Sequence, residues 1–232
     1  MKTALITGGS KGIGFGIAAK LIQDGYAVAI TGRESSQLKR SVDELNAIKP
    51  DHALGIKADV RDFSDQQEAV NQVLQKWGSL DVLIANAGIG HFSSIENLTD
   101  EQWHETIDTN LTGVYYSVKA CLPALKKSKG YIITIASLAG TNFFANGSAY
   151  NASKFGLVGF TQAVMLDLRP YGIKVSTIMP GSVATYFNQH TPSPEDAWKI
   201  QPEDIGQLVV DMLRMNPRTL PSKIEVRPSM PK

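Results

Sequence analysis

A tyrosine and a lysine stand four positions apart in the segment SAYNASKFG, at Tyr150 and Lys154. Residues four apart on a helix share a face, so this spacing places an ammonium group next to a phenol. A phenol with a pKa of about 10 can donate a proton to a developing alkoxide, and a nearby cation favours its ionised form. The same pair also suits an ordinary solvated helix face. The rest of the sequence decides between these two interpretations.

Glycines and small polar residues stand where the predicted strands end. They form five groups: residues 7–14, Asp59-Val60, Asn86-Ala87-Gly88, Ser137, and Pro180-Gly181 with Thr185. In a sheet of parallel strands these ends lie along one edge, where open α/β folds bind their ligands. The tyrosine–lysine pair lies on a helix that follows one of these strands. All of these residues are therefore expected at a single site.

The segment TGGSKGIG, residues 7–14, follows the first predicted strand and opens a helix. Glycine permits a tight turn and a close backbone approach, and the start of a helix offers free N–H groups to a phosphate. The spacing is G-x-x-x-G-x-G rather than G-x-G-x-x-G, but its position still predicts nucleotide binding. The candidate contacts are Gly8, Ser10, Lys11, Gly12, Ile13 and Gly14.

Strand-like and helix-like patterns alternate along the chain. Apolar runs predict strands at 2–7, 26–31, 53–58, 80–85, 130–136, 173–179 and 223–226. Helical periodicity predicts helices at 13–25, 35–48, 64–77, 99–126, 148–169 and 202–215, with capping boxes at Ser64/Gln67 and Thr99/Gln102. Repeated βα units with short connections form a parallel sheet covered by helices on both faces. We therefore predict one Rossmann-type doubly wound α/β domain over residues 1–232, with about seven strands in three α/β/α layers.

The chain resembles the short-chain dehydrogenase/reductase family in its compact form. The resemblance covers nearly the whole chain and rests on motifs in the family's order: the glycine turn, Asn86-Ala87-Gly88, Asn110, Ser137, Tyr150, Lys154 and Pro180-Gly181. The sequence departs from the family at Ala85, where many relatives carry a second asparagine. That position usually packs, so the departure puts little in doubt. All four catalytic positions of the family are present.

A role for each catalytic position follows from this resemblance and from the chemistry of ketone reduction. Tyr150 is the expected general acid/base. Lys154 is expected to lower the pKa of Tyr150 and to hold the nicotinamide ribose, while Ser137 orients the substrate oxygen. Asn110 is expected to hold a water that links Lys154 to solvent. Further cofactor contacts are expected at Asp59, Val60, Asn86, Ala87, Gly88, Pro180, Gly181, Val183 and Thr185.

Cofactor choice depends on the end of the second predicted strand, Ile30-Thr31-Gly32-Arg33. Dehydrogenases that use NAD usually place an acidic residue here to bind the ribose hydroxyls. Gly32 stands at that position and Arg33 follows it. A guanidinium suits a 2′-phosphate, and Lys11 adds a second cation. Glu34 tempers this preference unless it faces solvent, and NADP(H) is the predicted cofactor.

The predicted activity is an NADP-dependent carbonyl reductase or alcohol dehydrogenase that acts on a small ketone, aldehyde or alcohol. A 3-oxoacyl-carrier-protein reductase is the alternative enzyme. The best contacts for an acidic carrier, Lys126, Lys127 and Lys129, stand far along a helix. A non-catalytic nucleotide-sensing protein is the alternative of another class, and the complete Asn-Ser-Tyr-Lys set speaks against it.

Substrate contacts are expected at Ser137, Tyr186, Phe143 and Phe144, although the two phenylalanines also suit a plain core. Residues 186–200 are rich in Pro, Asn, Gln and Ser, and this segment matches the family's substrate lid. The resemblance also implies a homodimer or homotetramer that assembles through the helices at 99–126 and 148–169.

Composition predicts few other partners. The formal net charge is +1 over 232 residues, which gives no electrostatic signal for nucleic acid or an anionic membrane. The four histidines lack metal-ligand spacing, so no metal site is predicted. Cys121 lies in an apolar helical pattern and suits a small core residue. The first residues lack the pattern of a signal peptide, and a cytoplasmic protein is expected.

Overall fold

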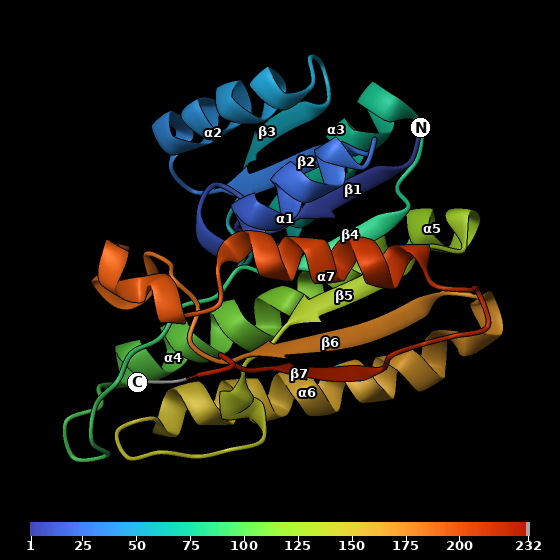
Figure 1. Cartoon of the computed structure of the whole chain (residues 1–232). Coiled ribbons are helices and arrows are strands. Elements are labelled where there is room, and N and C mark those ends of the chain that lie inside the picture. Colours follow the sequence, from blue (N-terminus) through green and yellow to red (C-terminus); the bar gives the residue numbers. More distant parts are fainter. Residues whose placement is uncertain (231–232) are drawn as a thin grey trace.

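Seven parallel strands form one sheet in the computed structural model, which describes residues 1–230. The strands are β1 (Thr3–Ile6), β2 (Ala27–Gly32), β3 (Ala53–Lys57), β4 (Val82–Ala85), β5 (Tyr131–Ile135), β6 (Lys174–Pro180) and β7 (Lys223–Val226). Their order across the sheet is β3-β2-β1-β4-β5-β6-β7 (Figure 1). The predicted seven-stranded, doubly wound parallel sheet is confirmed.

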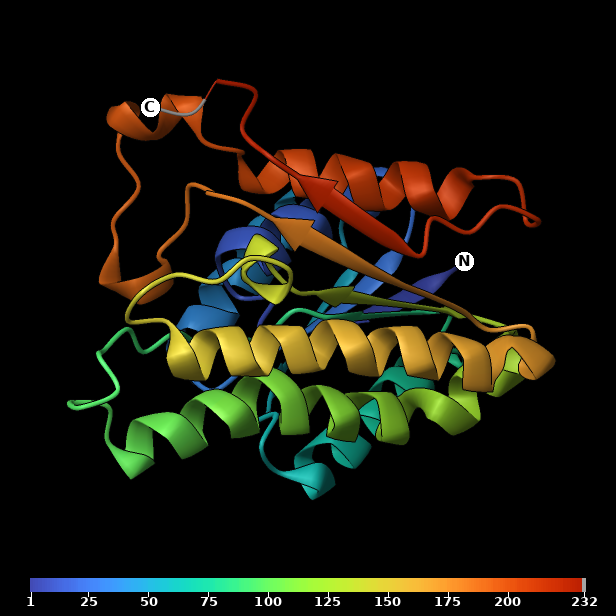
Figure 2. The same ribbon diagram turned by 90° about the horizontal axis from the view of Figure 1, so that it is seen from below.

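The central strands are apolar at successive positions because both faces of the sheet are covered. Alternate side chains of β1 enter different cores: Ala4 and Ile6 pack on one face, and Leu5 packs on the other. The helices on the first face are α1 (Gly12–Gln23), α2 (Ser35–Ile48) and α7 (Pro202–Arg214). Those on the second face are α3 (Phe63–Trp77), α5 (Gly113–Ser128) and α6 (Ser148–Leu168). Figure 2 shows α6 running beside α5.

The strand order reverses between β1 and β4, which are direct neighbours with Ile6 opposite Ile84. The chain leaves these two strands towards opposite halves of the sheet, so a crevice opens beyond their carboxyl ends. The glycine turn follows β1, and Asn86-Ala87-Gly88 follows β4. The fold thus brings together two motifs that lie about eighty residues apart in the chain, as the bond between Asn86 and Thr7 (|i−j| = 79) shows.

Two predicted helix boundaries are wrong. The cap of α3 is Asp62 rather than Ser64, because the Asp62 carboxylate accepts from the backbone N–H groups of Ser64 and Asp65. The single helix predicted at 99–126 is interrupted: α4 (Asp100–Ile107) passes through a π turn (Asp108–Thr112) into α5. The capping box of Thr99 with Gln102 is confirmed. Short 3₁₀ turns complete the described chain at Leu138–Gly140, Arg169–Tyr171, Phe187–Gln189 and Pro194–Trp198.

Candidate active site

The glycine turn after β1 leaves a bare backbone surface at the start of α1. Gly8 and Gly12 have positive φ values of 63° and 57°, a conformation that suits glycine. Gly14 begins the close contact of α1 with the sheet, since a Cβ there would lie 2.6 Å from both Asn86 Nδ2 and the Gly8 carbonyl oxygen. No side chain caps the N-terminus of α1. Its first N–H groups are therefore available to an anion.

Hydrogen bonds hold the ends of β1 and β4 together. The Thr7 hydroxyl accepts from the backbone N–H groups of Asn86 and Ala87, at 3.0 and 3.1 Å. The Asn86 amide in turn donates to the carbonyl oxygens of Thr7 and Gly8, at 2.9 and 3.0 Å. Thr7 was not singled out from the sequence, although its position at the end of a strand was a usable signal. The hydrogen bonds between Thr7 and Asn86 therefore hold the two sides of the crevice in place.

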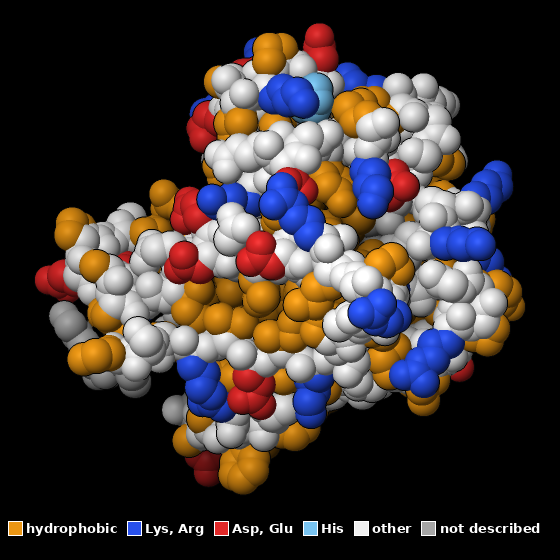
Figure 3. Space-filling model, turned by 45° about the vertical axis from the view of Figure 1, so that its right-hand side comes forward, with side chains coloured by type: hydrophobic (Ala, Val, Ile, Leu, Met, Phe, Trp, Pro, Cys, Tyr) orange, Lys and Arg blue, Asp and Glu red, His pale blue; other side chains and the backbone are white. Residues whose placement is uncertain are grey.

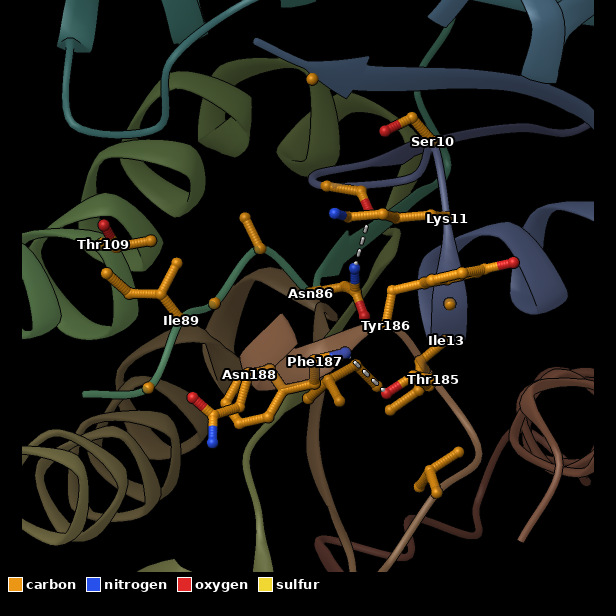
Figure 4. Close-up of a pocket in the computed structure, with 18 of the residues that line it drawn as sticks. Ser10, Lys11, Ile13, Asn86, Ile89, Thr109, Thr185, Tyr186, Phe187 and Asn188 are labelled. Carbon is orange, nitrogen blue, oxygen red and sulfur yellow. Dashed lines mark hydrogen bonds between the residues drawn. The ribbon is translucent and has the colours of Figure 1, made fainter. Parts of the chain in front are cut away.

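A cavity of about 1050 Å³ occupies the crevice, which is large enough for a dinucleotide and a small substrate. Most of the predicted site residues line it: Gly8, Ser10, Lys11, Gly12, Ile13, Arg33, Asp59, Val60, Asn86, Ala87, Gly88, Ser137, Tyr150, Lys154, Pro180, Gly181, Val183, Thr185 and Tyr186. Figure 4 shows Ser10, Lys11 and Ile13 near the glycine turn, and Ile89 and Thr109 on the opposite side. The sequence motifs therefore meet at one cavity, as expected.

One end of this cavity is cationic. Lys11 and Arg33 line it together with Arg40, a residue of α2 that the sequence interpretation missed. The Arg40 guanidinium donates to Gln37 Oε1 at 2.8 Å, and Gln37 Nε2 donates to the Ser10 carbonyl oxygen at 3.3 Å. Arg40 lies on α2 whereas Arg33 precedes that helix, so no helical spacing links the two residues in the sequence. Glu34 also lines this end.

Asp59 and Val60 line the cavity beyond β3. Arg61 engages the Asp59 carboxylate through two nitrogens, with Nη2 2.6 Å from Oδ2 and Nε 3.1 Å from both oxygens. These hydrogen bonds from Arg61 hold the pKa of Asp59 below its ordinary value. The carboxylate is therefore an ionised acceptor at neutral pH.

Ser137, Tyr150 and Lys154 meet at the other end of the cavity. Lys154 is 4% exposed, its Nζ donates to the Ile135 carbonyl oxygen at 3.2 Å, and it lies 5.7 Å from the centre of the Tyr150 ring. The Ser137 hydroxyl oxygen accepts from the Ala139 N–H at 3.1 Å, which leaves its proton free to donate. The tyrosine and the lysine belong to a packed site and not to a solvated helix face.

Burial shifts the pKa of both groups. It raises the pKa of the Tyr150 phenol, and the neighbouring Ser137 hydroxyl offsets part of that effect. Burial also lowers the pKa of Lys154 from 10.5 to about 8. Near pH 7 the phenol is thus neutral and the lysine largely charged. Burial therefore sets the direction of the Tyr150 shift in this structure, and the effect of Lys154 on the phenol stays a prediction.

Asn110 lies behind the cavity wall in the π turn between α4 and α5, fully buried. Its Oδ1 accepts from the Ile89 N–H at 2.8 Å, and its Nδ2 donates to the Ile89 carbonyl oxygen at 2.8 Å and to Ser153 Oγ at 3.0 Å. A Cβ at Gly88 would lie 3.3 Å from Asn110 Oδ1 and 3.5 Å from Lys154 Nζ. Asn110 therefore fixes the loop after β4 beside the lysine.

Residues 185–199, which hold most of the segment predicted as a substrate lid (186–200) and are called the lid below, form the opposite wall. Asp196 holds this segment together: its carboxylate contacts His190 Nε2 and Lys199 Nζ, both at 2.6 Å, and accepts from the Ser193 N–H at 3.0 Å. Hydrogen bonds from Lys199 and then His190 hold the pKa of Asp196 well below its ordinary value. Tyr186, Phe187 and Asn188 also line the cavity (Figure 4).

Two predicted substrate residues lie elsewhere. Phe143 is 86% exposed, and neither it nor Phe144 lines the cavity. Both belong to the turn that precedes α6, where the chain points outward. The aromatic residues that do reach Tyr150 are Phe92 and Phe187, with ring centres 5.3 and 5.7 Å from its own. Their segments follow β4 and β6, so their position beyond strand ends was the signal that the sequence offered.

Cys121 is fully buried, as predicted for a core residue. Within residues 1–230, no group of three or more His, Cys, Asp or Glu side chains is arranged to hold a metal ion. In the same part of the chain, no helix combines the length and apolar character needed to cross a membrane.

Comparison with known proteins gives consistent matches. A family model described as short chain dehydrogenase matches residues 2–196. The chain is 38% identical over 189 residues to a trans-4-hydroxycyclohexanecarboxylate dehydrogenase of Sinomonas cyclohexanicum, over 79% of this chain and 73% of that protein.

Solved structures match over the whole chain. An alcohol dehydrogenase from the archaeon Thermococcus sibiricus, complexed with 5-hydroxy-NADP, has a TM-score of 0.93 and 30% identity, and the match covers 100% of this chain and 99% of that one. A 3-ketoacyl-(acyl-carrier-protein) reductase from Brucella melitensis, complexed with NADH, has a TM-score of 0.89 and 27% identity over 98% and 97% of the two chains.

Proposed function

Because the chain belongs to the short-chain dehydrogenase/reductase family of oxidoreductases, we propose that it is an NADP(H)-dependent reductase of ketones or aldehydes that also oxidises the corresponding alcohols. One observation carries this proposal. A single cavity has Ser137, Tyr150 and Lys154 at one end and the cations of Lys11, Arg33 and Arg40 at the other.

The cavity fits a nicotinamide dinucleotide phosphate. The positive-φ glycines and the uncapped N-terminus of α1 suit the pyrophosphate. Thr31 Oγ1 at the end of β2 is buried, lacks a hydrogen-bond partner and belongs to a cavity-lining residue, so it suits a ligand hydroxyl. Arg33, Arg40 and Lys11 suit a 2′-phosphate. When bound, the nicotinamide ring supplies or accepts the hydride.

The chain's own residues handle the proton. In reduction, the neutral Tyr150 phenol donates its proton to the substrate oxygen, and Ser137 orients that oxygen through its free hydroxyl proton. The buried ammonium of Lys154 stabilises the phenolate that results. The Ile135 carbonyl oxygen accepts from the lysine, and Asn110 fixes the loop beside it through Ile89. In oxidation the same groups act in reverse.

The lid and the assembly complete the proposal. Residues 185–199 cover the substrate, and the single domain over 1–232 carries the whole site. Tyr115, Phe155 and Leu166 expose apolar side chains on α5 and α6, which supports a homo-oligomer through these helices. Figure 3 shows another face, on which hydrophobic side chains gather between charged ones. Either face suits contact between copies of the chain.

The test is oxidation of NADPH and of NADH by the purified protein with ketones, aldehydes and 3-oxoacyl thioesters. We expect turnover with NADPH, a weaker rate with NADH, and a loss of about 10²–10⁴-fold in Tyr150→Phe. Retained activity in Tyr150→Phe would contradict the assigned acid/base. A preference for NADH would contradict the role of the three cations. Cofactor binding without turnover of any carbonyl would favour a nucleotide sensor.

A further inference from the structure

Three aromatic rings from separate segments pack together beside the reactive end of the cavity, which Tyr150 and Phe187 line; the third, Phe92, also contacts the Phe144 ring at 5.8 Å. Phe92 follows β4, Phe187 belongs to the lid, and Tyr150 lies on α6. Their ring centres are 5.3 Å apart for Phe92 and Tyr150, 5.7 Å for Tyr150 and Phe187, and 6.3 Å for Phe92 and Phe187. The first and third of these pairs are edge-on, an arrangement that aromatic rings favour. The proposed proton donor thus forms one side of an aromatic triangle.

The two phenylalanine rings of this triangle pack directly against the backbone of Gly90. A Cβ at Gly90 would lie 2.7 Å from Phe187 Cζ and 2.8 Å from Phe92 Cζ, so both rings rest directly on this glycine. Gly90 follows Asn86-Ala87-Gly88 and lines the same cavity. The rings of Phe92 and Phe187 therefore contact the same loop that carries Asn86, Ala87 and Gly88, the expected cofactor contacts.

Phe187 lies on a segment with an unusual backbone. Its side chain is 37% exposed, the same fraction as Phe92, and the segment continues through Asn188 and Gln189, both with positive φ. Figure 4 shows Tyr186 and Phe187 pointing to opposite sides of this segment. The backbone N–H of Phe187 donates a hydrogen bond to Thr185 Oγ1 at 3.3 Å, and its side chain contacts the rings of Phe92 and Tyr150. Another flat ring can take its place when the lid moves.

The basic side chains near this end already contact carboxylates. His91 Nε2 lies 2.8 Å from Glu105 Oε2, while His190 and Lys199 both contact Asp196. Lys154 Nζ lies next to the proposed proton donor, 5.7 Å from the centre of the Tyr150 ring. An anionic group on a substrate would therefore compete with existing ion pairs, and a neutral substrate fits better.

On the basis of the proposed function, we propose that the substrate is a neutral ketone, or its secondary alcohol, whose reacting carbon bears a flat aromatic ring. That ring replaces Phe187 between Phe92 and Tyr150. The carbonyl carbon gains a hydride from the reduced nicotinamide cofactor, and the oxygen gains the Tyr150 proton. The C=O group becomes CH–OH as the cofactor is oxidised.

The test compares three ketones of equal carbon number, namely acetophenone, cyclohexyl methyl ketone and 2-octanone, together with charged 4-acetylbenzoate. Saturating NADPH and a common pH are used throughout. We expect kcat/KM to fall in the order flat ring, puckered ring, chain, with about tenfold between the first and the last. The kcat/KM for charged 4-acetylbenzoate should be lower than that for acetophenone. Equal or better turnover of 2-octanone overturns the inference.

Variants locate the preference. Phe92→Leu removes the stacking ring and should abolish the advantage of acetophenone over 2-octanone. Phe187→Ala removes the competing ring and should lower the KM for acetophenone while the preference remains. Phe143→Leu, in an exposed phenylalanine outside the cavity, is the matched control and should match the wild type. Circular dichroism confirms that each variant folds.

The two levels of the proposal fail differently. Turnover of some ketone that Tyr150→Phe abolishes, without a preference for aromatic rings, overturns the substrate class and leaves the proposed function standing. A preference that Phe92→Leu retains also overturns the inference. No turnover of any carbonyl with either cofactor overturns both.

Discussion

The two walls of the cavity are built in different ways. The fixed wall comprises the glycine turn, the loop after β4 and α6. Hydrogen bonds that the side chains of Thr7 and Asn110 accept and that of Asn86 donates hold it. The lid wall has one central carboxylate, Asp196, and exposed aromatic rings. Groups that must keep their geometry lie on the first wall, and groups that must admit a substrate lie on the second. Rigidity and access are thus assigned to different parts of the chain.

The largest effect is expected at the fixed wall, in Lys154→Met. Removal of the ammonium next to Tyr150 should lower kcat by about 10²–10⁴-fold. The same change should stabilise the protein at pH 7, by on the order of 3 kcal/mol, because burial lowers the pKa of Lys154 from 10.5 to about 8.

The sign follows from proton binding. Between pH 8 and 10.5 the unfolded chain holds the Lys154 proton that the folded chain has lost, so the stability of the wild type rises with pH there. The advantage of Lys154→Met should therefore shrink over this range. Urea unfolding at pH 7 and at about pH 10 measures it, and a variant less stable than the wild type at pH 7 would contradict the argument.

The next effect concerns the link between β1 and β4. Asn86→Asp keeps the shape of the side chain but replaces two donated hydrogen bonds with a carboxylate facing the carbonyl oxygens of Thr7 and Gly8. The free energy of unfolding should fall by about 2–3 kcal/mol, and NADPH affinity should fall with it. Asn97→Asp, the same substitution at an exposed position, should change stability by less than about 0.5 kcal/mol. Similar losses in both variants would show that the link does not fix the wall.

A smaller effect is expected at the cationic end. Arg40→Gln should weaken NADPH binding by about fivefold to tenfold and leave NADH binding unchanged, because the lost charge faces only a 2′-phosphate. Lys39→Gln, at an exposed neighbour outside the cavity, is the control. Fluorescence titration of both cofactors at low salt gives the affinities. Equal losses of NADPH and NADH affinity would show that Arg40 does not bind the 2′-phosphate.

The smallest effect is expected at the lid. Asp196→Asn loses the ion pairs with His190 and Lys199, so the KM for the ketone should rise about threefold while global stability hardly changes. Hydrogen exchange over residues 185–199 should become faster. The control is Glu195→Gln, at the exposed residue that precedes Asp196, and this variant should behave as the wild type. If Asp196→Asn lowered global stability as much as Asn86→Asp, the lid wall would be as important for stability as the fixed wall, contrary to this comparison.

The fixed wall was far more predictable from the sequence than the lid wall. Strand ends in a parallel sheet share an edge, so the positions of Gly8, Asn86 and Ser137 along the chain sufficed to bring them together. Tyr150 and Lys154 followed from helical spacing. The π turn was not visible in the sequence, since one extra residue in a turn leaves the helical periodicity of α4 before it and of α5 after it intact.

The errors have physical reasons. Asp62 and Ser64 are both good caps, and only the entry direction of the chain decides between them. Phe143 and Phe144 lie between Ser137 and Tyr150 in sequence, but neither lines the cavity. Arg40 reaches the site only because α2 packs beside the glycine turn, through Ser41 Oγ on the Ser10 carbonyl oxygen at 2.7 Å. Such tertiary contacts have no local sequence signature.

The π turn at Asp108–Thr112 also makes the length of this helix resistant to change. Deleting one residue there would restore a regular α-helix, yet each residue of an α-helix turns by about 100°. The apolar stripe of α5 that includes Val114, Val118 and Cys121 would then rotate away from the sheet, or α4 would rotate from α6. A lineage that carries this turn can exchange its side chains, but it cannot discard the extra residue in a single viable step.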